Sequence, residues 1–196
     1  MGIRLCFWFS SACYLMKGGR RRIYHDDPWC IPSVHVNIMD RNLHSIMKRV
    51  LDACCGSRMF YFDKENQEVL FADNRELQTT LCDGRSLLIK PDVNMDFRNM
   101  PYPDNTFKIV VFDPPHLLHA GARSWLAQKY GILPKEWKAY LKAGFQECMR
   151  VLETNGILVF KWNDDQIQFS EVLRVFGKKP LLGDQRGKTR WVIFLK

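Results

Sequence analysis

Residues 50–58 read Val50-Leu51-Asp52-Ala53-Cys54-Cys55-Gly56-Ser57-Arg58, an apolar run that ends at an acid and then turns through small residues. This pattern predicts a strand that delivers a ligand-binding turn. Residues 107–116 read Phe107-Lys108-Ile109-Val110-Val111-Phe112-Asp113-Pro114-Pro115-His116, a second strand-like run that ends in an acid and two prolines. In an open α/β sheet the ligand crevice lies beyond the carboxyl ends of parallel strands. The two turns are therefore expected to face one shared site.

The rest of the chain predicts an α/β fold, a single doubly wound Rossmann-like domain with a mostly parallel central sheet. Further strand-like runs occupy residues 68–73, 87–95 and 156–162. Residues 136–151 have the apolar spacing of a helix. Leu181 and Leu182 are expected to pair with residues 191–195 as a C-terminal antiparallel hairpin.

Length and composition limit the possible functions. A chain of 196 residues suits one α/β domain. Its formal net charge of +8 favours an anionic partner such as nucleic acid. The seven cysteines are odd in number and lack the paired spacing of a zinc site or a secreted disulfide framework. We therefore expect reduced thiols, a cytoplasmic protein and no metal.

Residues 1–46 fit the domain poorly and are predicted to be an N-terminal extension, poorly ordered, with the folded domain at residues 47–196. The apolar run at 5–16 is too short to span a bilayer, and the basic residues 17–22 follow it, whereas a signal peptide places its charge first. A brief alternation predicts at most one short strand, at Val34, Val36 and Ile38. A mis-assigned start and a basic arm that grips phosphate both remain open. We expect no membrane partner, although a membrane tether is an alternative.

At these motifs the chain resembles the class I S-adenosylmethionine (SAM) dependent methyltransferases. Among them it is most similar to the nucleic-acid amino-methyltransferases with an Asp-Pro-Pro-aromatic motif, in particular small phage-type DNA adenine methylases. Residues 52–57 match the glycine-rich SAM motif, and residues 113–116 match the catalytic motif with His116 where the family has Tyr, Phe or Trp. Residues 96–107 and 148–159 resemble the segments around the family's fourth and fifth strands. The likeness covers about residues 47–196, and it departs at 57–64, which are short for the helix expected there.

The resemblance implies SAM as the cofactor. The residues that match its binding positions are Asp52, Ala53, Cys54, Cys55, Gly56, Ser57, Asp73, Asp96 and Phe97. Small residues let backbone amides approach the methionine part, and an acid at the end of the second strand, Asp73, is where related folds hold ribose. Asp96 and Phe97 would border the adenine ring. The alternative is that Asp52 and Asp73 only end strands as turn-forming residues.

The resemblance also implies a catalytic group formed by Asp113, Pro114, Pro115 and His116. The two prolines make the loop after the strand rigid. If the Asp113 carboxylate and the Pro114 carbonyl accept the two N–H hydrogens of an exocyclic amine, its lone pair is aimed at the transferred methyl group. His116 would stack on a base that is flipped out or single-stranded. Structural termination of the strand by prolines, and a histidine that bonds the substrate or has no role, are the alternatives.

The sequence therefore predicts a SAM-dependent N-methyltransferase that acts on a nucleobase amine, adenine N6 in DNA before RNA. Methylation of RNA, of a protein glutamine or of a small-molecule amine is the alternative within enzymes. An idle SAM-binding accessory protein is the alternative outside them. No target-recognition domain is expected after the hairpin, so recognition would come from the connection at 116–134, the N-terminal segment, a dimer or a partner. Basic residues in the turn at 183–190 either contact phosphates or are ordinary solvated charges.

Overall fold

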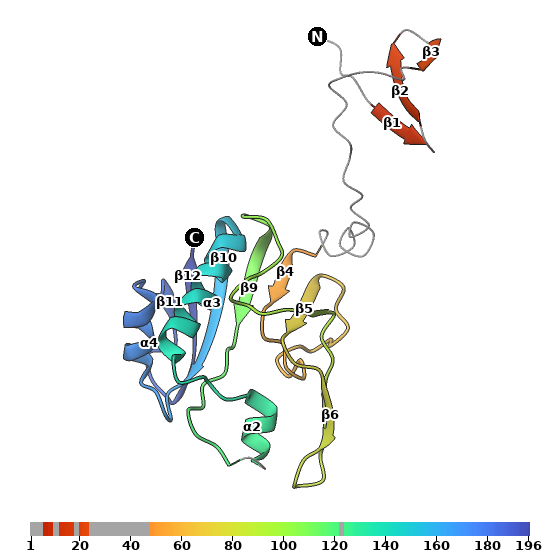
Figure 1. Ribbon diagram of the computed structural model, residues 1–196. Helices are drawn as coiled ribbons and strands as arrows, with labels where there is room; N and C mark the ends of the chain where they lie inside the picture. The colour runs from red at the N-terminus through yellow and green to blue at the C-terminus, as the bar shows by residue number, and fades with distance from the viewer. Residues whose placement is uncertain (1–5, 10–11, 18–19, 24–47, 122–123) are drawn as a thin grey trace. The chain divides into compact units, whose positions relative to one another are not determined.

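The computed structural model describes residues 6–9, 12–17, 20–23, 48–121 and 124–196 (Figure 1). The chain divides into two compact units, Met1–Met39 and Asp40–Lys196. In the first unit, β1 (Cys6–Phe9), β2 (Ala12–Lys17) and β3 (Arg20–Ile23) form an antiparallel sheet in that order. The sequence patterns did not indicate these strands. The strand predicted at residues 34–38 lies outside the described residues.

The second unit is built on a seven-stranded sheet in the order β11-β12-β10-β9-β4-β5-β8. Its strands are β4 (Val50–Asp52), β5 (Val69–Asp73), β8 (Val93–Asn94), β9 (Phe107–Phe112), β10 (Leu152–Asn163), β11 (Leu182–Gly183) and β12 (Thr189–Leu195). The five neighbouring strands β8, β5, β4, β9 and β10 run parallel to one another. In contrast, β12 runs antiparallel to both β10 and β11. The predicted α/β fold, with a mostly parallel sheet and a C-terminal hairpin, is confirmed.

The strand order reverses between β4 and β9. From β4 the chain adds β5 and then β8 on one side, and it then returns to add β9 and β10 on the other side. The register aligns Asp52 with Val111, and the amide of Ala53 donates to the carbonyl of Val111 at 3.0 Å. A reversal of this kind opens a crevice beyond the carboxyl ends of the two strands. The turn after β4 and the loop after β9 both lie at that crevice.

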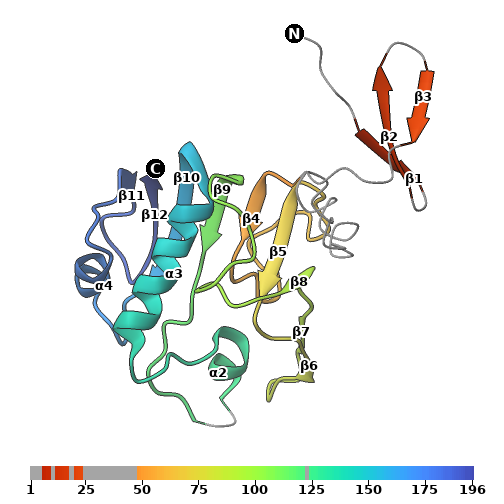
Figure 2. The same ribbon diagram turned by 45° about the horizontal axis from the view of Figure 1, so that its top comes forward.

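Two helices pack together on one face of the sheet, α3 (Trp137–Val151) and α4 (Phe169–Phe176), as Figures 1 and 2 show. The buried face of α3 includes Leu141, Phe145 and Cys148, which join the main core. Gly144 lies on the same face, where a Cβ atom would stand 2.5 Å from the Phe97 ring. The absent side chain therefore lets α3 approach the sheet closely beside the crevice.

The strand predicted at 87–95 is wrong as one element. Its first part is β7 (Ser86–Ile89), which pairs with β6 (Leu77–Thr80) in a separate antiparallel hairpin, and only β8 joins the main sheet. Leu87 and Ile89 are buried and their neighbours are exposed, the alternation of a hairpin with one covered face. That face packs against Trp125 of α2 (Trp125–Tyr130), a helix that the sequence patterns did not indicate. No helix in the described part of the chain has the length and apolar character needed to cross a bilayer.

Candidate active site

One pocket lies at the reversal of strand order and brings most of the predicted site residues together. The predicted residues that line it are Ala53, Cys54, Cys55, Gly56, Ser57, Asp73, Phe97, Asp113, Pro114 and Pro115. The other lining residues are Met59, Phe60, Asn74, Arg75, Lys129, Tyr130 and Tyr140, of which Lys129 and Tyr130 lie in the connection at 116–134 that was expected to contribute to recognition. Asp52, Asp96 and His116 are not part of this lining.

The turn after β4 is fixed to both neighbouring strands. Besides the contact of Ala53 with β9, the amide of Cys55 donates to the carbonyl of Ala72 in β5 at 2.8 Å. Gly56 has a φ of 50°, in the left-handed region that favours glycine, while a Cβ atom there would meet nothing within 4 Å. The glycine therefore serves the backbone conformation of the turn and leaves open space in front of it.

Asp52 lies behind this turn and is only 1% exposed. Its Oδ1 accepts a hydrogen bond from the amide of Cys54 at 3.1 Å. Burial raises the pKa of Asp52 to about 7, and the charges of Asp113 and Asp73 act in the same direction. The carboxylate therefore lacks a compensating positive charge, and a cationic ligand in the pocket would favour its ionised form.

Asp73 ends β5 with a carboxylate that is 3% exposed and has several donors. Its Oδ2 accepts from the amide of Gly56 at 2.9 Å, and its Oδ1 accepts from the amide and Nε of Arg75 at 3.0 and 3.1 Å. Arg75 also donates from Nη1 to the carbonyl of Gln128 in α2 at 3.3 Å. Arg75 thus joins the acid of the second strand to the helix that borders the pocket.

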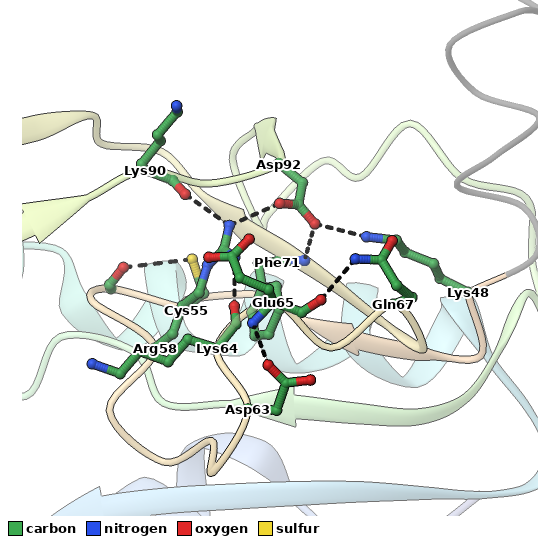
Figure 3. A network of polar contacts seen from close by, with 11 residues as sticks. Lys48, Cys55, Arg58, Asp63, Lys64, Glu65, Gln67, Phe71, Lys90 and Asp92 are labelled. Carbon is green, nitrogen blue, oxygen red and sulfur yellow. Dashed lines mark hydrogen bonds and ion pairs between the residues drawn. The ribbon is translucent and has the colours of Figure 1, made fainter.

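Arg58 holds the segment that replaces the expected helix after β4 (Figure 3). Its guanidinium donates to the carbonyl oxygens of Lys64 at 2.6 Å and Lys90 at 2.9 Å and to Asp92 Oδ1 at 2.7 Å. The ammonium of Lys48 reaches the other oxygen of Asp92 at 2.8 Å. The Arg58 side chain is 12% exposed and that of Asp92 is 30% exposed, so these charge-assisted bonds are only partly shielded from water. In place of the helix that was expected after β4, hydrogen bonds of the Arg58 side chain hold this segment in position.

Asp113 forms a buried ion pair with Lys161 of β10. The Lys161 Nζ lies 3.0 Å from each carboxylate oxygen, and the two side chains are 10% and 11% exposed. Burial raises the pKa of Asp113, whereas the charge and hydrogen bonds of Lys161 oppose that rise. The ammonium also lies 4.7 Å from the centroid of the Phe60 ring and 5.8 Å from that of Tyr130. The loop at 113–116 thus places its acid beside a cation that lies near two aromatic side chains.

His116 is not among the residues that line the pocket. It is 8% exposed and packs with ring centroids 5.1 Å from Tyr130 and 6.3 Å from Trp162. Burial, followed by the charge of Lys161, lowers its pKa to about 4, so the imidazole is neutral near pH 7. The stacking role assigned to His116 stays a prediction.

The predicted adenine-bordering pair is divided. Phe97 lines the pocket and makes edge-to-face contacts with Phe112 and Tyr140. Asp96 instead accepts hydrogen bonds from the amide and the Nε of Arg98, at 2.8 and 3.0 Å. The Arg98 guanidinium in turn lies 4.7 Å from the centroid of the Tyr140 ring. Asp96 is therefore linked to the pocket wall only indirectly, through Arg98 and Tyr140.

The basic turn before β12 is partly neutralised by acids after β10. Lys188 Nζ lies 2.7 Å from Asp165, and Arg190 Nη2 lies 3.0 Å from Asp164. Among the residues that the structure describes, no group of three or more His, Cys, Asp or Glu side chains is arranged to hold a metal ion.

Comparisons with known proteins bear on the fold. No protein-family profile and no curated protein matches the sequence. Among solved structures, the PH0226 protein of Pyrococcus horikoshii OT3 is similar with a TM-score of 0.50 at 15% identity, over 78% of this chain and 86% of that one. A SAM-dependent methyltransferase of the DUF858 family from Leishmania major gives 0.43 at 14% identity, over 76% and 64%. The [4+2]-cyclase SpnF gives 0.40 at 14% identity, over 74% and 58%. At these identities the first likeness shows a shared fold.

Proposed function

We propose that this chain is a SAM-dependent methyltransferase that transfers a methyl group to the exocyclic amine of a nucleobase, with adenine N6 in DNA as its preferred substrate. The observation that carries the proposal is that the turn at 53–57 and the loop Asp113-Pro114-Pro115 line the same pocket. One turn has the chemistry of a cofactor site and the other that of an amine site. Methyl transfer requires the two to be adjacent.

The residues around the turn fit the cofactor. The open space before Gly56 accommodates the methionine part, and Asp73, which lines the pocket at the end of β5, would accept from ribose hydroxyls in addition to its bonds from Gly56 and Arg75. The unneutralised carboxylate of Asp52 favours a ligand with positive charge. SAM, when bound, supplies an electrophilic methyl group on a cationic sulfur. Phe97 and Tyr140 offer apolar surface for an adenine ring in the same pocket.

The catalytic loop would orient the acceptor. An exocyclic amine on a heterocycle is a poor nucleophile because its lone pair is delocalised into the ring. Acceptance of its two N–H hydrogens by the Asp113 carboxylate and the Pro114 carbonyl localises that lone pair on nitrogen and directs it. The rigid prolines hold these acceptors in place without a reorganisation cost. No covalent intermediate with the protein is required.

A second candidate is a SAM-binding accessory protein without turnover. It is favoured by the Lys161 ammonium, which contacts both oxygens of Asp113 at the position where an amine would donate. For an enzyme, the substrate amine must share the carboxylate with Lys161 or displace it. An ionised carboxylate has about four lone-pair sites, which allows sharing.

The test is a competition for methyl label. Purified protein is incubated with labelled SAM and equal masses of unmethylated DNA, RNA and a protein extract, with the D113A variant as control. We expect label in DNA, absent with D113A. Label in RNA or protein would redirect the substrate assignment. If the wild type binds SAM but labels none of the acceptors, the result would support the accessory-protein candidate. If the wild type does not bind SAM, both candidates are rejected.

A further inference from the structure

The histidine of the catalytic motif is not available as a stacking surface for an acceptor. His116 is buried and lies outside the pocket lining, whereas Tyr130, whose ring centroid is 5.1 Å from that of His116, lines the pocket. An acceptor base held at Asp113 would therefore meet a different ring.

Tyr130 is brought to the catalytic loop by a non-local contact. The amide of Leu133 donates to the carbonyl of Leu117 at 2.8 Å, so the long connection after the motif closes on itself. Tyr130 is the last residue of α2, and Gly131 follows it with a φ of 75°. A Cβ atom at Gly131 would lie 3.3 Å from Pro115 Cγ, which shows how closely this end of α2 approaches the prolines.

A second ring, from another segment, lies against the ammonium that pairs with Asp113. Phe60, in the segment held by Arg58, lines the pocket and lies 4.7 Å from Lys161 Nζ, while Tyr130 lies 5.8 Å from it. That ammonium touches both oxygens of Asp113. Two aromatic side chains beside a buried carboxylate suit a flat heterocycle that carries an amine.

We infer that Tyr130, together with Phe60, forms the aromatic contact for the acceptor base in place of His116. The inference rests on the proposed function and names its base-binding residues. Tyr130 is a substrate-binding residue, whereas His116 supports it from behind.

The test measures methyl transfer to a single-stranded adenine oligonucleotide over a range of concentrations. A second readout is quenching of 2-aminopurine placed at the target position, with S-adenosylhomocysteine present. The variants are Y130A, Y130F, H116Q and, as a matched control on the exposed face of α2, L126A. Loss of one stacking contact predicts a KM raised roughly 5- to 150-fold and loss of quenching in Y130A. L126A is expected to stay close to the wild type. Y130F keeps the ring and should show a smaller rise in KM than Y130A, and H116Q should lose stability without the rise in KM.

The outcomes separate this inference from the proposed function. Wild-type methylation of adenine with an unchanged KM and quench in Y130A would overturn the inference alone. An equal rise in KM for H116Q, with cofactor binding intact, would return the stacking role to His116 and would also overturn it. A wild-type protein that neither methylates nor quenches the oligonucleotide would overturn the proposed function and the inference together.

Discussion

Replacement of Asp52 by asparagine should stabilise the protein and weaken cofactor binding. The folded pKa of about 7 lies about three pH units above the ordinary value of 3.8. At 1.36 kcal/mol per pH unit, ionisation of this buried carboxylate costs about 4 kcal/mol at pH 8. The asparagine has nearly the same shape, and its carbonyl can still accept from the Cys54 amide. D52N should therefore raise the free energy of unfolding at pH 8 by up to about 4 kcal/mol.

The sign of the pH dependence follows from the direction of the shift. Between about pH 4 and pH 7 the folded state keeps a proton on Asp52 that the unfolded state has lost. The contribution of Asp52 to stability therefore falls as pH rises through this window and is constant above it. The gain from D52N should be full at pH 8 and shrink towards zero near pH 4.

Urea unfolding at several pH values checks this prediction, with D92N as a matched control. Burial acts to raise the pKa of Asp92, but hydrogen bonds and charges from its neighbours, Lys48 first, lower it overall. D92N should therefore destabilise the protein at pH 8, the opposite sign. If D52N is less stable than the wild type at pH 8, or if the difference in unfolding free energy between the two does not change with pH, ionisation of Asp52 does not destabilise the folded protein. Calorimetric titration should show weaker binding of cationic SAM to D52N.

Three further substitutions test the packing and charge around the site. K161M leaves the buried Asp113 carboxylate unpaired, so its pKa should rise and the acidic limb of the pH–rate profile should move to higher pH; an unmoved limb would contradict this. R58A removes the bonds that hold the segment after β4 and should cost about 3 kcal/mol in urea unfolding, with faster proteolysis within residues 59–67. G144A places a methyl group against the Phe97 ring and should cost about 1–3 kcal/mol of stability despite alanine's higher helix propensity; a stabilised G144A would refute the close packing.

Local patterns were sufficient for the strands that carry the site. The runs ending at Asp52, Asp73 and Asp113 are apolar and bounded by turn residues, and each forms a strand whose carboxyl end lies at the pocket. The prediction at 87–95 was wrong because two short strands, β7 and β8, are separated only by a few residues that include Lys90 and Pro91. Such a run is easily taken for one irregular strand. The strand that pairs with its first half, residues 77–80, has two β-branched threonines but is only four residues long and has no apolar alternation.

The pocket walls could be predicted less well because they depend on contacts distant in sequence. Tyr130 reaches the prolines at 114–115 through the Leu117–Leu133 hydrogen bond and a close approach at Gly131, neither of which has a local signal. Lys161 falls within the strand predicted at 156–162, but its pairing with Asp113 depends on the register of β9 and β10. The pair Asp113-Pro114 predicts a site that orients an amine, whereas the residues that surround this pair are determined by the topology of the sheet.

Identification of the methylated product shows whether this chain transfers a methyl group to adenine N6 in DNA. Full-length protein and its D113A variant are incubated with SAM and unmethylated DNA, and the DNA is digested to nucleosides that are identified by mass. We expect N6-methyladenine with the wild type and none with D113A, while both bind SAM. No methylated nucleoside from the wild type, or the same yield from D113A, would contradict it.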